Sequence, residues 1–313
     1  MRMETSSALP EASGAPDATG AFSALAGTLR AELKRHCYRM MGGVQDAEDC
    51  VQETLLRGWR EFATLRDGAA GRPWFYSIAT RVCLDALRTR RRRQTLFGPS
   101  LDEIEPGTEP WIEPWPGAVP PSGPERAEHL RLAFVSLLQG LSPRARAVLL
   151  LHEGVGMTAA EAAAALDISV AAARSALQRA RVALPAQHLV ADDNTPVEAY
   201  VDAWNAGDVG ALIRLLHRDI VLTMPPWHRT FAGADEVARF MTGVWPRYHG
   251  FRAMALLANG QSAAAVYTRR DAAAYLPHSL HLLAGSRQIR EIVLYAPPLG
   301  AGLFAAFGLP TSR

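Results

Sequence analysis

The sequence predicts a multidomain chain in which two all-α domains, the second with a helix-turn-helix, are followed by an α+β cone. Three observations support this fold class. Apolar residues recur at three- or four-residue steps from Phe22 onward. Residues 156–184 read as two short helices around a tight turn, and the second helix is basic along one side. Beyond residue 195, two helical segments precede a series of strand-like runs, a pattern typical of helices packed on a sheet.

Composition limits the classes of protein to consider. A chain of 313 residues supports two or three domains, and 49% hydrophobic residues supply enough material for buried cores. No run of eighteen apolar residues exists, and no secretory signal opens the chain, so we expect a cytoplasmic protein without membrane contact. The three cysteines lack metal-ligand spacing, so we expect them to be buried thiols rather than metal ligands. We also expect no cofactor.

The first helical domain is expected over residues 21–95, after a disordered tail at 1–20. Its first helix ends at Gly42-Gly43, and Asp46 is expected to cap the second helix. The polar residues of that second helix form either a solvated face or a docking surface for a basic partner. They include Asp46, Glu48, Asp49, Gln52 and Glu53.

Pro73 suits the first turn of a third helix, which ends in an arginine run over residues 88–93. Trp74 and Tyr76 are candidates either for the core or for stacking on the bases of single-stranded DNA. The arginines are either a solvated helix end that favours the macrodipole or contacts to phosphates. The net charge of +2 does not decide between these readings, because the local distribution matters more.

Residues 96–127 are predicted to form a linker, since their proline content excludes a helix. The plain interpretation is an extended spacer. Trp111 and Trp115 are, however, large residues for a spacer.

The second helical domain is expected over residues 128–188, with a helix from Arg126 and another capped by Ser142. Thr158 and Glu161 have capping-box spacing at the start of the helix-turn-helix, and Ser169 suits the cap of its second helix. That second helix has the shape and charge to lie in a DNA major groove. Its candidate DNA-binding residues are Arg174, Ser175, Gln178, Arg179 and Arg181.

The last domain is expected over residues 195–313, opening with a cap at Thr195-Pro196. Two helices, a third at Ala234–Val244 and five strands predict a curved antiparallel sheet closed into a cone. Such a cone would enclose a pocket lined by aromatic and polar side chains. The candidates are Trp204, Met224, Trp227, His228, Trp245, Tyr248 and Tyr267.

His228, Asp235 and His278 are the candidates in this domain for proton transfer, should the cone be catalytic. Because no spacing forces an Asp/His pair together, we favour the alternative in which His228 lies in a surface loop and the aromatic residues form the core. We therefore expect no catalytic residues, and ligand sensing or intramolecular regulation rather than turnover.

The stretches DAEDCVQETLLRGW, PWFYSIATRVCLDALRTRRR and LSPRARAVLLLHEGVGMTAAEAAAALDISVAAARSALQRARVAL together resemble the extracytoplasmic-function (group four) RNA polymerase sigma factors. The resemblance implies core RNA polymerase and promoter DNA as partners. The second helix would bind the β′ clamp helices, and the helix-turn-helix would read the −35 element and touch the β flap. The third helix would recognise and melt the −10 element through Trp74, Tyr76, Arg81, Arg88, Arg90 and Arg91.

Arg81 departs from the family, which often has Asn there, so the base preference at the −10 element stays open. The stretch AYVDAWNAGDVGALIRLLHRDIVLTMPP resembles the SnoaL-like polyketide cyclases, and the ending LFAAFGLP resembles sigma factors that carry this extension. Such extensions imply a built-in regulator that contacts the sigma domains and the Trp/Pro linker. A small-molecule ligand of the cone is a further expectation.

Two alternatives from other classes remain at this point. One is a stand-alone helix-turn-helix regulator that binds duplex DNA without polymerase, usually as a dimer. The sequence offers no obvious dimerisation helix for it. The other is a bifunctional protein whose cone has cyclase-like or isomerase-like activity.

Overall fold

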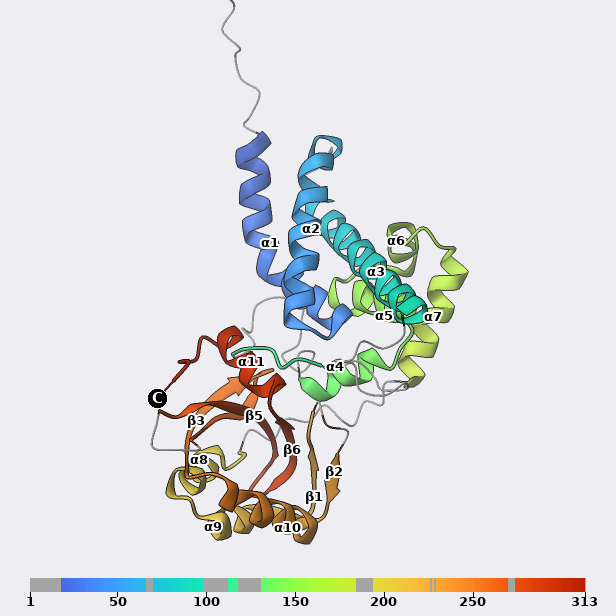
Figure 1. Ribbon diagram of the computed structural model, residues 1–313. Helices are drawn as coiled ribbons and strands as arrows, with labels where there is room; N and C mark the ends of the chain where they lie inside the picture. Colours follow the sequence, from blue (N-terminus) through green and yellow to red (C-terminus); the bar gives the residue numbers. More distant parts are fainter. Residues whose placement is uncertain are drawn as a thin grey trace, which may run out of the picture.

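The computed structural model describes residues 18–65, 70–97, 112–117, 131–183, 194–225, 227, 229–269 and 274–312. Helices α1 to α7 gather in one part of the molecule, and a sheet with helices α8 to α11 forms the other (Figure 1). The predicted tail lies outside the described residues except for residues 18–20, which are already helical.

Three helices form the first helical domain, as the apolar periodicity predicts. Leu33, Val51, Phe75 and Ile78 lie on the faces that meet and are all buried. The elements are α1 (Ala18–Met41), α2 (Val44–Glu61), the short 3-10 helix η1 (Phe62–Thr64) and α3 (Gly71–Phe97).

The prediction that Asp46 caps α2 is wrong. Helix α2 begins two residues earlier, at Val44, and its N-cap is Gly43, which has no side chain to offer. The carboxylate of Glu113 supplies the missing acceptor, because its Oε2 lies 2.7 Å from the backbone N of Val44 and 3.4 Å from that of Gln45. An acidic group suits this position, where the helix dipole is positive. The linker therefore completes a helix of the first domain.

All three cysteines are buried, as predicted, with one on each helix of this domain. Hydrogen bonds from Cys37 and Cys50, together with burial, hold the pKa of the Cys83 thiol well above its usual value. The Cys83 thiol is therefore a protonated core group. Within the described residues, no group of three potential metal ligands comes together.

The second helical domain follows the predicted caps closely. The Ser142 side chain caps α5, Thr158 and Glu161 form a complete capping box on α6, and the Ser169 Oγ accepts from Ala172 N at 3.1 Å. The described part starts at residue 131, so the helix start predicted at Arg126 lies outside it. The elements are α4 (Leu132–Gln139), α5 (Pro143–Leu149), the π-helical turn η4 (Leu150–Gly154), α6 (Ala159–Ala165) and α7 (Val170–Ala183).

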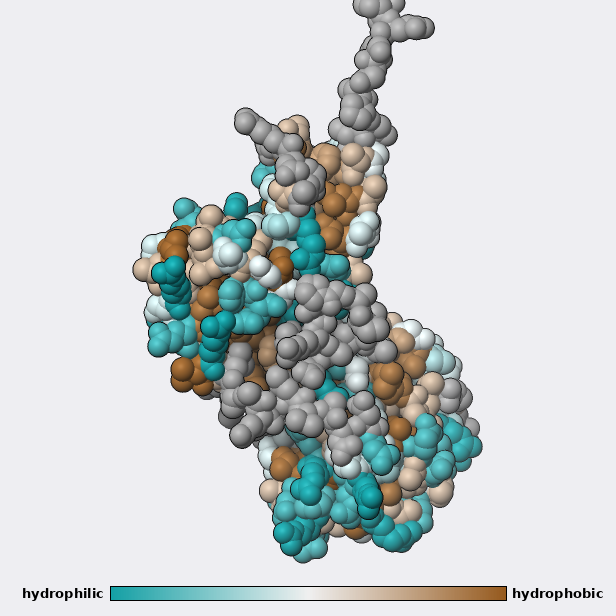
Figure 2. Space-filling model, turned by 180° about the vertical axis from the view of Figure 1, so that it is seen from behind, coloured by the Kyte–Doolittle hydropathy of each residue, from teal (hydrophilic) through white to brown (hydrophobic). Residues whose placement is uncertain are grey.

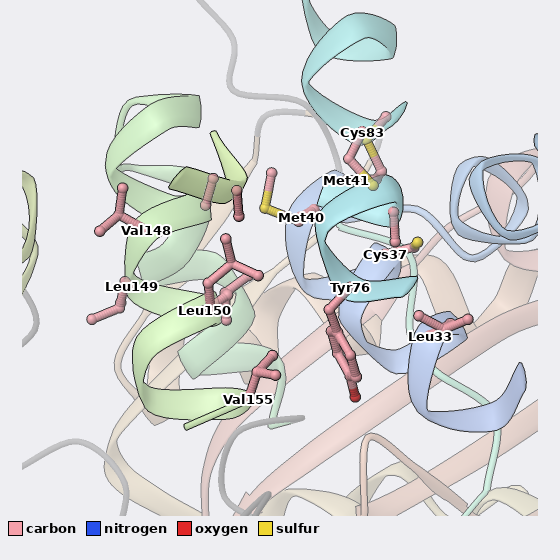
Figure 3. Packing of buried hydrophobic residues seen from close by; sticks show 14 of the residues in the cluster. Leu33, Cys37, Met40, Met41, Tyr76, Cys83, Val148, Leu149, Leu150 and Val155 are labelled. Carbon is pink, nitrogen blue, oxygen red and sulfur yellow. The ribbon is translucent and has the colours of Figure 1, made fainter. Parts of the chain in front are cut away.

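The two helical domains share one hydrophobic core. Buried residues of α1 to α3 and of α4 to α7 belong to a single continuous cluster. In Figure 3, Met40 and Tyr76 of the first domain lie across from Val148, Leu150 and Val155 of the second. The domains therefore meet through apolar side chains, as elements inside one domain do.

In the described residues, the C-terminal domain is a cone of four α-helices on a six-stranded sheet in the order β2-β1-β6-β5-β4-β3. The predicted α10 has the expected bounds, whereas β2 and α11 were not predicted. Its elements are α8 (Val197–Ala206), α9 (Val209–Arg214), β1 (Leu216–Thr223), β2 (Thr230–Ala232), α10 (Ala234–Val244), η6 (Trp245–Arg247), β3 (Gly250–Ala258), β4 (Gln261–Arg269), β5 (Leu276–Gly285), β6 (Ile289–Tyr295) and α11 (Leu299–Ala306).

Two local predictions for this domain need correction. The sheet is not wholly antiparallel, because β1 and β6 pair in parallel. Thr195 does not cap α8: Pro196 is the N-cap residue, and the Thr195 hydroxyl donates to the carbonyl of Gly285 at 2.7 Å instead. Both features arise from contacts between segments far apart in the chain.

The sheet is covered on both faces, which explains the unbroken burial of residues 263–268 in β4. Helices α8 and α10 pack on one face through Trp204, Val237 and Met241. The other face belongs to a separate cluster, to which α11 contributes Phe304. That cluster also contains Leu132, the first residue of α4, so the second helical domain contacts the sheet directly.

Candidate nucleic-acid interface

The polar face of α7 is open. Arg174, Ser175, Gln178, Arg179 and Arg181 are all exposed, while the opposite face is buried. Arg179 donates to the Ser175 hydroxyl at 2.7 Å, and Arg181 pairs with Glu153 at 2.7 Å. Within the described residues, the side chains of Arg174 and Gln178 make no hydrogen bond. Two side chains suited to reading base edges are therefore free on this helix.

A shallow hollow of about 410 Å³ runs along α7 between Arg174, Leu177, Gln178, Arg181 and Val182. Val182 is 82% exposed, although it is apolar. The hollow lies on the face that the sequence predicts to meet a DNA groove.

Several residues of α3 that are predicted to contact DNA are engaged with the protein. The Arg81 Nε donates to the Ala165 carbonyl at 2.8 Å, across the two helical domains. Arg88 pairs with Asp85 at 2.9 Å, and Arg90 with Asp46 at 3.5 Å. Arg91 is exposed, and Trp74 is half-buried beside Phe75.

Tyr76 is a core residue, which corrects its prediction as a base-stacking residue. Its ring has no exposed surface, packs against His36 at 5.0 Å and carries the Arg72 guanidinium over one face. Its hydroxyl donates to Glu32 at 3.1 Å. A ring enclosed in this way has no face for a base, so Trp74 is the aromatic residue of this helix that remains for stacking.

The acidic residues of α2 lie on a partly exposed surface. Lys34 and Arg30 both pair with Glu48, and the hydrogen bond from Lys34 is the main cause that holds the pKa of Glu48 below its usual value. Asp49 accepts a hydrogen bond from Gln45, Glu53 pairs with Arg57, and Gln52 is exposed.

Beside this surface lie Leu56 and Trp59, which are 54% and 46% exposed. Figure 2 shows apolar side chains at the free end of the helical part, where α1 starts and α2 ends. A mixed surface of acids and exposed apolar groups is typical of a protein-binding site.

Hydrogen bonds from two arginines hold the two helical domains together, which keeps α3 and α7 close to each other. Arg146 of α5 is only 4% exposed, and its guanidinium donates to the Met40 carbonyl of α1. It also donates to the Gln139 and Leu141 carbonyls, at 3.0 and 3.2 Å. Burial lowers the pKa of Arg146 to about 10, which leaves it charged at neutral pH. Arg72 adds a bond to the Val155 carbonyl at 3.2 Å.

The described part of the linker, residues 112–117, lies between the first helical domain and the cone; we call it the linker strap. Toward the helices, the Glu113 N donates to the Gly42 carbonyl at 2.9 Å, and the Tyr38 hydroxyl donates to the Glu113 carbonyl at 2.7 Å. Trp115 packs on Tyr38 with the ring centroids 5.1 Å apart, and the Lys34 Nζ lies over the Trp115 ring, 5.5 Å from its centroid.

Toward the cone, the strap continues the sheet. Asn259 and Trp115 exchange two hydrogen bonds of 2.8 Å, one from each backbone N, and Pro116 bridges Ala258 as an antiparallel strand would. The Asn259 Nδ2 also donates to the Tyr38 hydroxyl at 2.9 Å, which joins the cone to α1. Trp111, the other predicted docking residue, lies outside the described residues.

Sequence reasoning missed Asn259, although its setting has a recognisable pattern. Asn259 has φ +54° and Gly260 has φ +67°, and together they form the two-residue loop between β3 and β4. Asn-Gly is the preferred pair for such a hairpin turn. The turn could be predicted from sequence, but its partners Trp115 and Tyr38 could not, because they lie 144 and 221 residues away.

The predicted pocket of the cone is not lined as expected. Trp204 is only 6% exposed and packs on Trp245 at 4.4 Å and Phe251 at 4.8 Å, so it is a core residue. Tyr267 faces the opposite side of the sheet, where it contacts Phe304. Trp227 is 48% exposed, and His228 lies outside the described residues.

A chain of hydrogen bonds crosses the cone instead. Tyr200 bonds His281 at 2.8 Å, His281 bonds Ser279 at 2.7 Å, and Ser279 bonds His278 at 3.1 Å. The chain ends at Tyr248, 2.9 Å from His278. Burial, followed by the nearby His278, lowers the pKa of His281 to about 3, so this ring is neutral near pH 7. Asp235 lies apart from it, in the first turn of α10.

Two helical domains, the second with a helix-turn-helix, joined to a cone, have the architecture expected of a modular transcription protein, and comparison with known families agrees. Sigma-70 region 2 matches residues 25–93, Sigma-70 region 4 matches residues 131–184, and a SnoaL-like domain matches residues 197–285. The described residues contain no helix long and apolar enough to cross a membrane.

The chain belongs to the extracytoplasmic-function (ECF) RNA polymerase sigma factors. It is 38% identical over 334 residues to ECF RNA polymerase sigma factor SigG of Mycobacterium tuberculosis (strain CDC 1551 / Oshkosh), covering 98% of this chain and 89% of that protein. It is 36% identical over 233 residues to ECF RNA polymerase sigma factor SigJ of the same species, covering 70% and 72%. The crystal structure of SigJ superposes with a TM-score of 0.64 at 28% identity, covering 94% of this chain and 99% of that one.

Membership of the family gives this chain its general role and partners. It is an RNA polymerase sigma factor, a transcription protein that works with core RNA polymerase and promoter DNA. The named relatives are themselves ECF RNA polymerase sigma factors.

Proposed function

We propose that this sigma factor directs core polymerase in the cytoplasm to promoters through the two surfaces described above, and that the cone restrains it in a closed arrangement. In this proposal, α7 reads the −35 element and touches the β flap, and α3 opens the −10 element. The acidic and apolar surface of α2 binds the β′ clamp helices.

The distance between the two promoter elements supports the restraint. Their names place them roughly 25 base pairs apart, which is on the order of 80 Å at about 3.4 Å per base pair. A domain the size of the second helical domain has a radius of gyration of about 10 Å. Arg81 and Ala165 hold the two helical domains in contact. Two domains in contact cannot bind both promoter elements at once. The two domains must therefore separate for promoter binding.

The linker strap is the observation that carries the role of the cone. It caps α2 through Glu113, contacts Tyr38 of α1 and pairs with the Asn259 turn of the cone. The Tyr295 hydroxyl of β6 adds a bond to the Ile112 carbonyl at 2.7 Å. Because one short segment bonds both sides, the cone and the first helical domain are held together through the linker.

We propose regulation rather than turnover for the cone. Trp204 is buried against Trp245 and Phe251, and among the described residues no hydrogen bond joins Asp235 to His278 or His281. The proposal also includes a small-molecule ligand of the cone. Binding of this ligand would be a signal that changes how the cone contacts the linker strap. Product formation by the isolated full chain, lost in His278→Ala, would instead favour the bifunctional alternative.

The experiment is in vitro transcription with core polymerase, comparing the native chain with Asn259→Gly. Glycine keeps the left-handed backbone of the turn and removes only the amide that bonds Trp115 and Tyr38. We expect Asn259→Gly to raise promoter-specific transcription several-fold and to increase the radius of gyration in solution scattering. The exposed Asp235→Asn is the matched control in the same domain.

Two outcomes would contradict the proposal at different levels. If the native chain and a chain ending near residue 189 both fail to bind core polymerase, the sigma-factor surfaces are wrongly assigned. If Asn259→Gly opens the molecule but lowers transcription, the cone is an activator rather than a restraint.

A further inference from the structure

A small cleft between the two helical domains has an excess of positive charge. It has a volume of about 250 Å³ and is lined by residues of both domains, including two leucines. Its charged lining residues are Arg57, Arg81, Asp85, Arg88 and Arg144. Helices α2 and α3 contribute the first four, and the first turn of α5 contributes Arg144. The cleft exists only while the two domains are in contact.

The carboxylates nearby do not balance the guanidinium groups. Asp85 pairs with Arg57 at 3.3 Å and with Arg88 at 2.9 Å. Glu53, outside the cleft, takes a second bond from Arg57 at 2.7 Å. Four arginines therefore face two carboxylates, and arginine stays protonated at all physiological pH values.

Two of the arginines have guanidinium N–H donors that are not used in the hydrogen bonds described above. The Nε of Arg81 is used by the Ala165 carbonyl, which leaves the two terminal nitrogens of the guanidinium. Within the described part of the chain, Arg144 makes no hydrogen bond or ion pair, and it is exposed. These donors come from different domains and line the same space.

Guanidinium groups bind planar or tetrahedral oxyanions through paired hydrogen bonds, and phosphate with two negative charges is the strongest of the common ones. The cleft is smaller than the roughly 300–1,000 Å³ of pockets that enclose whole drug-sized ligands. It therefore matches a phosphate or diphosphate group better than a complete nucleotide buried with its base.

We propose that this cleft binds the phosphate group of a small phosphorylated molecule, such as a nucleotide, and that binding holds the two helical domains together. A ligand that contacts Arg144 on one side and Arg81 or Arg88 on the other binds the closed arrangement and not the separated one. It therefore shifts the population toward the closed arrangement.

The proposal rests on the proposed function in one respect. Arg81 and Arg88 are also expected to contact the −10 strand, so the free phosphate and the DNA backbone present the same chemistry to the same side chains. Arg144 separates the two sources, because it lies in the cleft but on neither DNA-binding helix.

The first measurement is calorimetric titration of the full chain with inorganic pyrophosphate at constant ionic strength. We expect one saturable site in the native chain and at least a tenfold weaker affinity in Arg144→Gln. Arg92→Gln, on the exposed end of α3 outside the cleft, is the matched control and should bind within twofold of the native chain. Unchanged circular dichroism confirms that each variant is folded. Absence of saturable binding to the native chain, or equal binding by Arg144→Gln, overturns the proposal.

The second measurement identifies the source of the phosphate. A fluorescent single-stranded −10 oligonucleotide should bind the native chain and Arg144→Gln with equal affinity, and pyrophosphate should weaken binding of the oligonucleotide to the native chain alone. If Arg144→Gln loses oligonucleotide affinity as well, the cleft is part of the DNA path and the proposal is wrong. Transcription by Arg144→Gln without pyrophosphate should equal that of the native chain, so a failed sigma-factor assignment would show in both proteins.

Discussion

Helices α7 and α3 are the two helices expected to read promoter DNA, and the structure treats them differently. The polar face of α7 is exposed, and its Arg174 and Gln178 are free for base edges among the described residues. On α3, Arg81 bonds the second domain, Arg88 and Arg90 bond carboxylates, and Tyr76 is buried. The residues expected to contact the −10 element are therefore more engaged with the protein than those expected to contact the −35 element, and the Arg81 bond is the contact among them that crosses the two domains.

This difference has a physical cause. A helix-turn-helix presents its second helix outward from a compact support, so packing the support against another domain leaves that face free. Helix α3 is long. One of its faces packs in the core, and another is expected to contact DNA. When α5 and α6 pack against it, part of that DNA face becomes an interdomain contact.

The largest expected effect breaks the closure itself. Arg146→Met removes the charged hydrogen bonds that α5 makes to α1 and leaves those carbonyls without a partner. We expect the free energy of unfolding to fall by about 2–4 kcal/mol and the domains to separate in solution scattering. Chemical denaturation measures the first effect. The exposed Arg179→Met is the control, with a change within about 0.5 kcal/mol.

A second test addresses the open helix. Arg174→Ala or Gln178→Ala should reduce discrimination between a native and a mutated −35 element by about 1–3 kcal/mol, if each contacts a base edge. Competitive binding of the holoenzyme to the two promoters measures the difference. An equal loss on both promoters would show that the residue contacts phosphate.

A third test addresses the occupied helix. Arg81→Asn shortens the side chain and removes its 2.8 Å bond to Ala165. A single interdomain hydrogen bond of this kind contributes about 0.5–1.5 kcal/mol. We therefore expect a modest shift toward the open arrangement, seen as faster hydrogen exchange at the end of α6. If exchange in α6 is unchanged while −10 preference alters, Arg81 acts on DNA only.

The smallest effect is expected at Arg91, on the exposed end of α3. Arg91→Ala should weaken binding to all promoters to a similar extent and reduce the slope of log affinity against log salt by about 1. Salt titrations on two unrelated promoters provide the measurement. A loss confined to one promoter would contradict a phosphate contact.

Elements with local causes could be predicted from the sequence. Ser142, Ser169 and the pair Thr158–Glu161 act within three residues of themselves, so the caps of the helix-turn-helix domain are where the sequence predicts them. Helix α10 has its predicted bounds for the same reason. The exposed polar face of α7 follows from its 3.6-residue period.

The tertiary structure alone decided what depends on distant partners. Glu113 caps α2 across 69 residues, and β1 pairs in parallel with β6 after most of the cone has intervened. From the sequence, Tyr76 could equally have faced DNA. In the structure, His36, Arg72 and Glu32 enclose it. Periodicity indicates which face of a helix is apolar. Contacts between distant segments decide which domain, strap or DNA strand meets the polar face of a helix, and no local pattern connects those segments.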